Sequence, residues 1–360
     1  KFSKFGYNKY MLNILVAPYD YNINGEKYAK RIVRYLKTEK IEYSVYFSPK
    51  IEDIGKNAHA LSNEGETDFV VVGDEQILHE FLNNVEDISK IRLGIIPLGK
   101  HDDLASYLDL ESNPLNAIKR ILQNKVKQID YMFVNDKIVI NNILIGASCE
   151  LFEVYNQFKM KNIITKNWVL MQYGNNFEGI ELTIENEDNP PFSEQVFELS
   201  ISNAGSSKNL QISPLSNLTD GLINFNYCTS PEREKRKKYL KLFKKGNQIY
   251  DENTKQFWVK NLKITNAEQK IKALVDGKIE NFEELDISIV PSGLKIFNTI
   301  EKEVPLPVEK KKKSKMNEIV EIPHKELTES EIEEIENSNL EETIDQEKDK
   351  KDKKEKNRKR

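Results

Sequence analysis

The chain has 360 residues, with 54 Lys and Arg, 58 Asp and Glu, and a formal net charge of −4 at pH 7. Its length predicts about two domains, and its charge argues against a nucleic-acid binder, which would have a strongly basic surface. Two cysteines cannot form a disulfide framework and indicate a reducing compartment. Because no stretch approaches the roughly 20 apolar residues of a membrane span, we expect a cytoplasmic protein whose membrane contact is peripheral, at the inner face.

Residues 11–125 are predicted to form a Rossmann-like parallel α/β domain. Apolar runs indicate strands at residues 12–16, 41–47, 69–72 and 91–97, and apolar residues at helical spacing indicate helices at 26–37, 51–61, 77–82 and 114–122. This alternation favours a parallel sheet with right-handed crossovers. Ligands of such sheets bind beyond the carboxyl ends of the strands, so we expect the chemistry at the turns after Val16, Val72 and Pro97.

Residues 126–298 are predicted to form an all-β domain of the sandwich type. Strand-like segments occupy residues 128–134, 137–145, 179–184, 195–203, 222–227, 257–264, 270–275, 285–290 and 294–297. Two helices are expected, near residues 151–158 and 231–245, and the last strand is a candidate to return to the first domain. Residues 299–360 are predicted to be a disordered tail, because 34 of the last 60 positions are charged and few are apolar.

Short motifs follow consecutive predicted strands. Gly73 and Asp74 follow the third strand, and the segment from Pro97 to Ala105, which contains Gly99, follows the fourth about 25 residues later. Further fragments match in order at Pro18, Asn141, Gly146, Asn203, Gly205, Pro214, Asp220, Gly221, Leu222, Asp276, Gly277 and Pro291. Over about residues 11–298 this series resembles the diacylglycerol kinase catalytic-domain family, which includes bacterial lipid kinases and sphingosine kinases.

The resemblance implies a nucleotide site, with ATP as a substrate. It places this site at Pro18, Ser48, Gly73, Asp74, Gly99, Lys100 and Asp103. The motifs are degenerate, because Glu75 and Gln76 stand where the family has Gly and Thr, and Lys100 and His101 replace Thr and Gly. Glycines let the backbone approach phosphates closely, whereas Glu75 brings negative charge towards them. Lys100 is either a substitute phosphate ligand or a solvated loop lysine.

The resemblance also implies where the proton of the lipid hydroxyl is accepted. The family's general base is the glutamate of a D-G-E motif, and here Asp276 and Gly277 are followed by Lys278. Asp276 and Lys278 therefore occupy the catalytic position. A lysine, with a reference pKa of about 10.4, is protonated at pH 7 and cannot accept a proton. Catalysis is therefore predicted to be impaired, unless Glu280, on the same face of the strand, replaces the base.

A structural magnesium site is implied at Asn217, Asp220 and Leu222, the last through its backbone carbonyl. Magnesium prefers oxygen ligands and commonly keeps several waters, so one carboxylate with carbonyls is adequate. The competing interpretation is that Asp220 and Gly221 form only a turn into the following strand.

Residues 231–245 contain eight basic residues together with Tyr239, Leu240, Leu242 and Phe243. A basic amphipathic helix of this kind can lie on an anionic membrane surface. The alternative is a solvated helix that crosses between two strands.

The sequence thus predicts a lipid kinase-like phosphotransferase that uses ATP and magnesium, with impaired catalysis. The alternative is a pseudoenzyme kept as a nucleotide-, lipid- or protein-binding module. A weaker alternative is a soluble nucleotide kinase of the NAD kinase group, whose N-E pair is not evident because Asn142 follows Asn141. Expected partners are a nucleotide and a lipid at the membrane surface, and the resemblance is compatible with a homodimer.

His79 and His101 are interpreted as ordinary helix and loop residues, and Cys149 and Cys228 as buried apolar ones.

Overall fold

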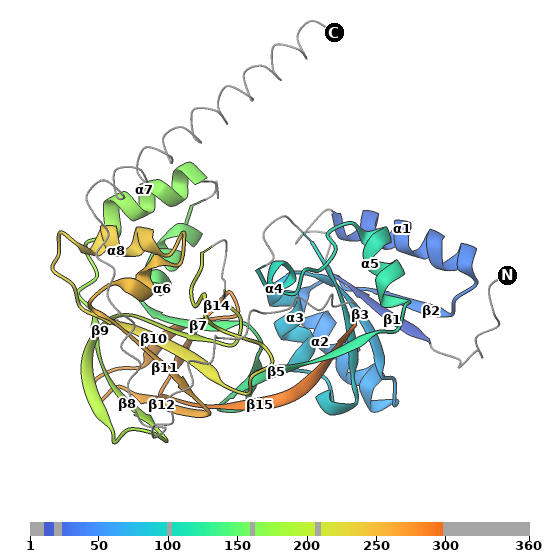
Figure 1. Ribbon diagram of the computed structural model, residues 1–360. Helices are drawn as coiled ribbons and strands as arrows, with labels where there is room; N and C mark the ends of the chain where they lie inside the picture. The colour runs from blue at the N-terminus through green and yellow to red at the C-terminus, as the bar shows by residue number, and fades with distance from the viewer. Residues whose placement is uncertain (1–10, 18–23, 99–102, 159–162, 206–209, 298–360) are drawn as a thin grey trace, which may run out of the picture. The chain divides into compact units, whose positions relative to one another are not determined.

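Four parallel strands in the order β2-β1-β3-β4 form the N-terminal sheet in the computed structural model, which describes residues 11–17, 24–98, 103–158, 163–205 and 210–297 (Figure 1). The strands are β1 (Leu12–Val16), β2 (Tyr43–Phe47), β3 (Asp68–Gly73) and β4 (Arg92–Pro97). The helices are α1 (Asn24–Glu39), α2 (Ile51–Asn63), α3 (Glu75–Leu82), η1 (Ile88–Lys90), α4 (Asp103–Tyr107) and α5 (Pro114–Ile121). Every residue of β1 and β3 is buried, as in sheets covered by helices on both faces.

The predicted elements of this part are confirmed to within two residues at each end. The agreement follows from their simple patterning, since the strands are unbroken apolar runs and the helices place apolar residues on one stripe. The short helix α4 was not predicted. Apart from Tyr250–Glu252, the described residues form one compact unit.

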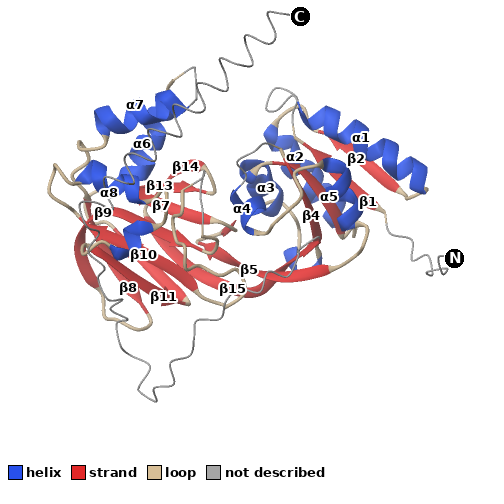
Figure 2. Ribbon diagram, turned by 45° about the horizontal axis from the view of Figure 1, so that its top comes forward, coloured by secondary structure: helices blue, strands red, loops and turns tan. Residues whose placement is uncertain are grey.

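The second part of the chain is built from antiparallel strands (Figure 2). They are β5 (Val126–Val134), β6 (Lys137–Val139), β7 (Asn142–Gly146), β8 (Ile180–Asn186), β9 (Phe192–Ser202), β10 (Ile223–Thr229), β11 (Thr254–Val259), β12 (Asn261–Thr265), β13 (Ile271–Val275), β14 (Lys278–Phe282) and β15 (Glu284–Phe297). The long strand β15 pairs antiparallel with β5 and β12, and near its end Lys295 and Ile296 pair parallel with β4. All strands therefore belong to one continuous sheet, and the predicted class, α/β plus all-β, is confirmed.

Three hydrophobic cores lie along this sheet. The first fills the parallel part and the second lies among the antiparallel strands. The third packs α6 (Ala147–Asn156), α7 (Ile163–Tyr173) and α8 (Arg236–Leu242) against the antiparallel part, where the short η2 (Asn247–Tyr250) also occurs.

Several boundaries in the antiparallel part differ from the prediction. The predicted strand 257–264 is two strands, because β11 pairs with β10 whereas β12 pairs with β8 and β15. The predicted strands 285–290 and 294–297 are one strand, β15, with an irregularity between Val290 and Leu294. Helix α7 was not predicted. The predicted tail lies outside the described residues, and the predicted domain boundaries stay a prediction.

Candidate functional site

The predicted catalytic position lies in a tight hairpin turn between β13 and β14. Val275 pairs with Lys278, so Asp276 and Gly277 alone make the turn. Their φ angles are 41° and 82°, and two consecutive positive φ angles are what a type I′ turn requires. An Asp-Gly pair adopts these angles at little cost, which explains why the turn forms at this point of the sequence.

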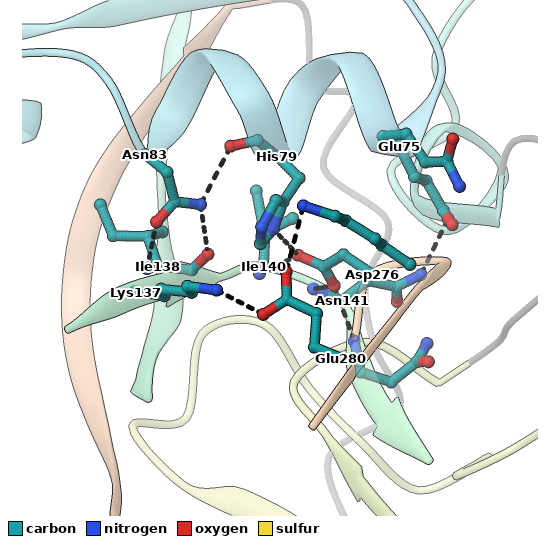
Figure 3. Close-up of polar contacts among 12 residues, drawn as sticks. Glu75, His79, Asn83, Lys137, Ile138, Ile140, Asn141, Asp276 and Glu280 are labelled. Atoms are coloured by element: carbon teal, nitrogen blue, oxygen red, sulfur yellow. Dashed lines mark hydrogen bonds and ion pairs between the residues drawn. The ribbon is translucent and has the colours of Figure 1, made fainter. Parts of the chain in front are cut away.

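The Asp276 carboxylate is buried and accepts hydrogen bonds from three consecutive backbone amides. The donors are the N–H groups of Ile140 (2.9 Å), Asn141 (3.0 Å) and Asn142 (3.2 Å). The Nδ1 atom of His79 lies 3.4 Å from Asp276 Oδ2 (Figure 3). These contacts explain why the predicted strand 137–145 is divided into β6 and β7: the amides at the break bind Asp276 in place of a neighbouring strand.

Side chains of helix α3 contact both residues of this turn. Gln76 donates its side-chain N–H to the carbonyl of Gly277 (2.8 Å), and His79 is buried against Asp276. Asn83 then joins the helix to β6, because its amide group accepts from the Ile138 N–H and donates to the Ile138 carbonyl. The interpretation of His79 as an ordinary helix residue missed its contact with Asp276. The only sequence signal was its position beside Leu78, on the apolar side of the helix.

The base position carries an ion-paired lysine. Lys278 Nζ lies 3.3 Å from Glu280 Oε1. Lys137 Nζ binds the other oxygen of the same carboxylate (Figure 3). Burial raises the pKa of Glu280, but the hydrogen bonds and charges of Lys137 and Lys278 outweigh it and hold this pKa below its ordinary value. The side chain of Glu280 is only 11% exposed, whereas that of Lys278 is 58% exposed.

The carboxylate of Glu75 is bound within the protein. Glu75 is buried at the start of α3, and its Oε1 accepts hydrogen bonds from the side chain of Asn141 (2.8 Å) and the backbone N–H of Leu104 (3.3 Å). The residue before it, Asp74, caps α3 by accepting from the N–H groups of Gln76 and Ile77. Glu75 therefore holds negative charge between the loop after β3 and the start of α4.

The predicted nucleotide residues that the structure describes lie at the carboxyl ends of adjacent strands. Gly73 ends β3. Ser48 follows β2, and the backbone N–H of Ser48 donates to the carbonyl of Val16. The buried hydroxyl of Ser48 has no hydrogen-bond partner among the described residues. Asp103 begins α4. Pro18, Gly99 and Lys100 lie outside the described residues.

The predicted metal residues lie in a loop that wraps around Asp130. Asp220 Oδ1 accepts from the Leu222 N–H (3.0 Å), and the side-chain oxygen of Asn217 is already bound by the N–H and hydroxyl of Thr219. Burial first, and then the charge of Asp130, raise the pKa of Asp220. Among the described residues, no basic side chain forms an ion pair with either carboxylate, and no group of three or more His, Cys, Asp and Glu could hold a metal ion.

Asp130 was not predicted as a site residue. It is buried in the middle of β5, and its oxygens accept the N–H groups of Gly221 and Ser292, each at 2.7 Å. An acidic residue inside the apolar run from Ile129 to Val134 was the signal that could have found it. The two cysteines are buried and unbridged, as predicted, and no described helix is long and apolar enough to cross a bilayer.

Comparisons with known proteins find similarity to diacylglycerol kinases. Residues 13–134 match the model of the diacylglycerol kinase catalytic domain. A diacylglycerol kinase of Staphylococcus epidermidis is 28% identical over 147 residues, which are 39% of this chain and 46% of that protein. A diacylglycerol kinase of Staphylococcus aureus is 26% identical over 132 residues, which are 36% of this chain and 42% of that protein. The chain thus matches less than half the length of these relatives.

Solved structures share the fold. A diacylglycerol kinase structure from Bacillus anthracis strain Sterne superposes with a TM-score of 0.60 and 15% identity, over 81% of this chain and 97% of that chain. Yeast NADH kinase superposes with a TM-score of 0.51 and 10% identity, over 82% of this chain and 85% of that chain. The resemblance that the motifs predict is therefore confirmed: residues 13–134 match the diacylglycerol kinase catalytic-domain family.

Proposed function

We propose that this chain is a lipid kinase-like protein that binds a nucleotide at the strand ends of its α/β part and a lipid through its antiparallel part, and that its phosphoryl transfer is impaired. The observation that carries the proposal is Lys278, which stands at the base position of the family and pairs with Glu280. The nucleotide side rests on Ser48, Gly73, Asp74 and the start of α4, which gather at the carboxyl edge of the parallel sheet.

The proposed impairment follows from the proton that a lipid hydroxyl must lose. Lys278 offers an ammonium, which cannot accept it. Asp276 already accepts three backbone hydrogen bonds and is buried. Glu280 is held between two lysines that lower its pKa, which makes it a weaker base. Lys278, Asp276 and Glu280 are thus each poorly suited to general-base catalysis.

The proposed weakness in nucleotide binding follows from Glu75. Phosphoryl transfer depends on positioning and on neutralising phosphate charge. The carboxylate of Glu75 takes the side-chain donor of Asn141 and a backbone N–H at the start of α4, and its charge repels a phosphate that approaches the same loop.

The loop around Asp130 suits a magnesium ion. Two carboxylates lie close enough for the charge of Asp130 to raise the pKa of Asp220, and no described basic side chain pairs with either. Asp130, Asp220 and the backbone carbonyl of Leu222 would hold the ion. The side-chain oxygen of Asn217 already accepts two hydrogen bonds, whereas each bonded carboxylate oxygen of Asp130 and Asp220 accepts one. When bound, magnesium would neutralise the two carboxylates and fix the loop.

Two measurements test the proposed function. Calorimetry with millimolar ATP and magnesium should give a weak binding heat, and Glu75→Gly should strengthen it because the repelling carboxylate is removed. Transfer of labelled phosphate from ATP to diacylglycerol micelles should be at background for the wild type. Lys278→Glu should raise it, because general-base catalysis is worth about 10²–10⁴-fold.

The control is Lys278→Gln, which removes the charge without adding a proton acceptor and should stay at background. Wild-type activity that Lys278→Glu abolishes would contradict the proposed impairment. The second candidate function, an inactive binding module, is favoured by the internal binding of Glu75. If the protein binds ATP but no variant transfers phosphate, including the double variant Glu75→Gly with Lys278→Glu, the result would favour the inactive binding module.

A further inference from the structure

Helix α7 exposes an apolar stripe to solvent. Ile164, Trp168 and Met171 are 73%, 45% and 65% exposed, and their spacing of i, i+4 and i+7 places them on one helix face. Four of the nine exposed large hydrophobic side chains among the described residues belong to this helix, Tyr173 being the fourth. Val169, on another side of α7, is buried and attaches the helix to the protein.

A basic helix lies beside this stripe. Lys237 of α8 donates its ammonium to the carbonyl of Met171 (2.8 Å), and its backbone N–H donates to the side chain of Asn175 (3.1 Å). Figure 2 shows the two helices next to each other. The exposed basic side chains around α8 are Arg233, Lys235, Lys238, Lys241, Lys244 and Lys245.

Most apolar residues of this segment are not available to a partner. Tyr239, Leu240 and Phe243 are buried in the third hydrophobic core, and Leu242 is partly buried. The segment that the sequence indicated as a membrane helix therefore presents mainly charged side chains, six basic and the two acidic ones of Glu232 and Glu234. The larger apolar surface next to it comes from α7. We call the stripe Ile164, Trp168 and Met171, together with the basic side chains around α8, the α7–α8 face.

We propose that the α7–α8 face docks on an anionic lipid bilayer, with the stripe of α7 inserted at the boundary between headgroups and acyl chains. Apolar insertion and attraction between basic residues and anionic headgroups are the two contributions that hold interfacial helices. A second copy of this chain fits less well, because it would bring the same basic side chains against each other. The inference rests on the proposed function only in choosing a lipid surface over a protein.

Docking through α7 would hold the candidate site near the lipid. Helix α7 contacts α6, and Lys272 pairs with Glu150 and Glu153 of α6. Lys272 belongs to β13, the strand that ends at the Asp276 turn. The α7–α8 face is therefore connected through α6 to the strand that carries the predicted base position, and a bilayer bound there would lie at the same end of the antiparallel part.

Tryptophan fluorescence of the full chain tests insertion directly. The chain has two tryptophans, so Trp258→Phe leaves Trp168 as the single reporter. With phosphatidylcholine vesicles that contain a third of phosphatidylglycerol, Trp168 emission should shift to the blue and be quenched by brominated acyl chains. If Trp258→Phe does not fold, the difference between the wild type and Trp168→Phe gives the same signal.

Vesicle sedimentation without ATP separates the contribution of apolar insertion from that of attraction between basic residues and anionic headgroups. Ile164→Ser with Met171→Ser should reduce partitioning by about tenfold or more. Its matched control is Phe47→Ser, which removes a 53% exposed aromatic side chain from β2 and should change nothing. Lys238→Gln with Lys245→Gln should reduce partitioning by about fivefold per lysine, whereas Lys37→Gln with Lys125→Gln, in the α/β part, should not.

Three outcomes would overturn the inference. Binding to anionic vesicles without quenching of Trp168 means surface adsorption without insertion. A blue shift that depends on protein concentration in the absence of vesicles means that a second copy covers the stripe. A blue shift that is present without vesicles and lost when residues 299–360 are deleted means that the tail covers it. Failure of ATP binding leaves each of these readouts unchanged, so failure of the proposed function is distinguishable.

Discussion

Two buried aspartates, Asp276 and Asp130, hold their loops in the same way but differ in their surroundings. Each accepts hydrogen bonds from backbone N–H groups, three at Asp276 and two at Asp130. Asp276 also has His79 beside it, 3.4 Å away. Asp130 instead has a second carboxylate near it, that of Asp220, whose pKa is raised by burial first and then by the charge of Asp130.

The two carboxylates thus differ in their neighbours: Asp276 lies beside a histidine, whereas Asp130 lies near a second carboxylate. A buried charge is costly unless it is paired and hydrogen-bonded. The site of Asp276 provides its own donors, so we expect this carboxylate to hold the hairpin without a ligand. The pair Asp130 and Asp220 has excess negative charge, which a cation would neutralise.

The largest effect is expected at Asp276. Asp276→Ala leaves the N–H groups of Ile140, Asn141 and Asn142 buried without their acceptor and places alanine at a positive φ. We expect the free energy of unfolding in urea to fall by about 3–5 kcal/mol. Lys278→Ala, two residues away and exposed, should cost less than about 0.5 kcal/mol. Similar losses for both variants would contradict a structural role for Asp276.

A third buried carboxyl, Glu198, sharpens the comparison because it has few donors. The Ser148 N–H donates to its Oε2 (2.7 Å), and its Oε1 has no partner in the described part of the chain. Burial raises the pKa of Glu198 from 4.5 to about 8. Between these values Glu198 is ionised in the unfolded chain but protonated in the folded one. Folding therefore takes up a proton, and the contribution of Glu198 to stability decreases as the pH rises through this range.

Glu198→Gln should remove this dependence, because the amide is neutral and still accepts from Ser148. At pH 8 the variant should be more stable than the wild type by about 2 kcal/mol or more, and near pH 4.5 the two should agree. Urea titrations across this pH range measure the difference. Glu181→Gln, on the exposed side of β8, is the control and should have no such effect. A gain that is equal at both pH values would exclude this explanation.

Magnesium should stabilise the wild type through Asp130 and Asp220. At ten times its dissociation constant, a ligand adds about 1.4 kcal/mol, which corresponds to a melting temperature rise of about 2–5 °C. Asp220→Asn and Asp130→Asn should each abolish the rise, and the exposed Asp188→Asn should keep it. The measurement is a thermal melt with and without magnesium. A rise that persists in both asparagine variants would show that the ion binds elsewhere.

The parallel part of the fold could be predicted because its signals are local. Strands β1, β3 and β4 are apolar runs, and their helices have one apolar stripe. The break between β6 and β7 could not be predicted, because Asp276, which causes it, lies about 135 residues away in sequence. The same holds for the contact of His79 with Asp276, at a separation of 197 residues.

Helix α7 shows a different limit of sequence patterning. Its apolar residues face both the core, as Val169 does, and the solvent, as Ile164 and Met171 do. A helix with apolar residues on two sides lacks the single stripe by which surface helices are recognised. The predicted site residues stay a prediction. Asp130 was not among them, and three predicted nucleotide residues lie outside the described part of the chain.

The smallest expected effect concerns the two lysines that pair with Glu280, next to the predicted base position. Lys137, 37% exposed, binds one oxygen, and Lys278, 58% exposed, lies 3.3 Å from the other. Because these lysines hold the pKa of Glu280 below its ordinary value, the stability they provide is present above the unfolded pKa of Glu280. It is lost as the pH falls through the lower, folded pKa.

Lys137→Gln should therefore cost less than about 1 kcal/mol at pH 7 after solvent screening, and Lys278→Gln less still. Urea titrations in low and high salt should show both losses shrinking with salt and vanishing in acid. If Lys278→Gln costs more than Lys137→Gln, the amine at the base position is part of the fold, and its replacement by glutamate would then disturb the hairpin before it could restore a proton acceptor.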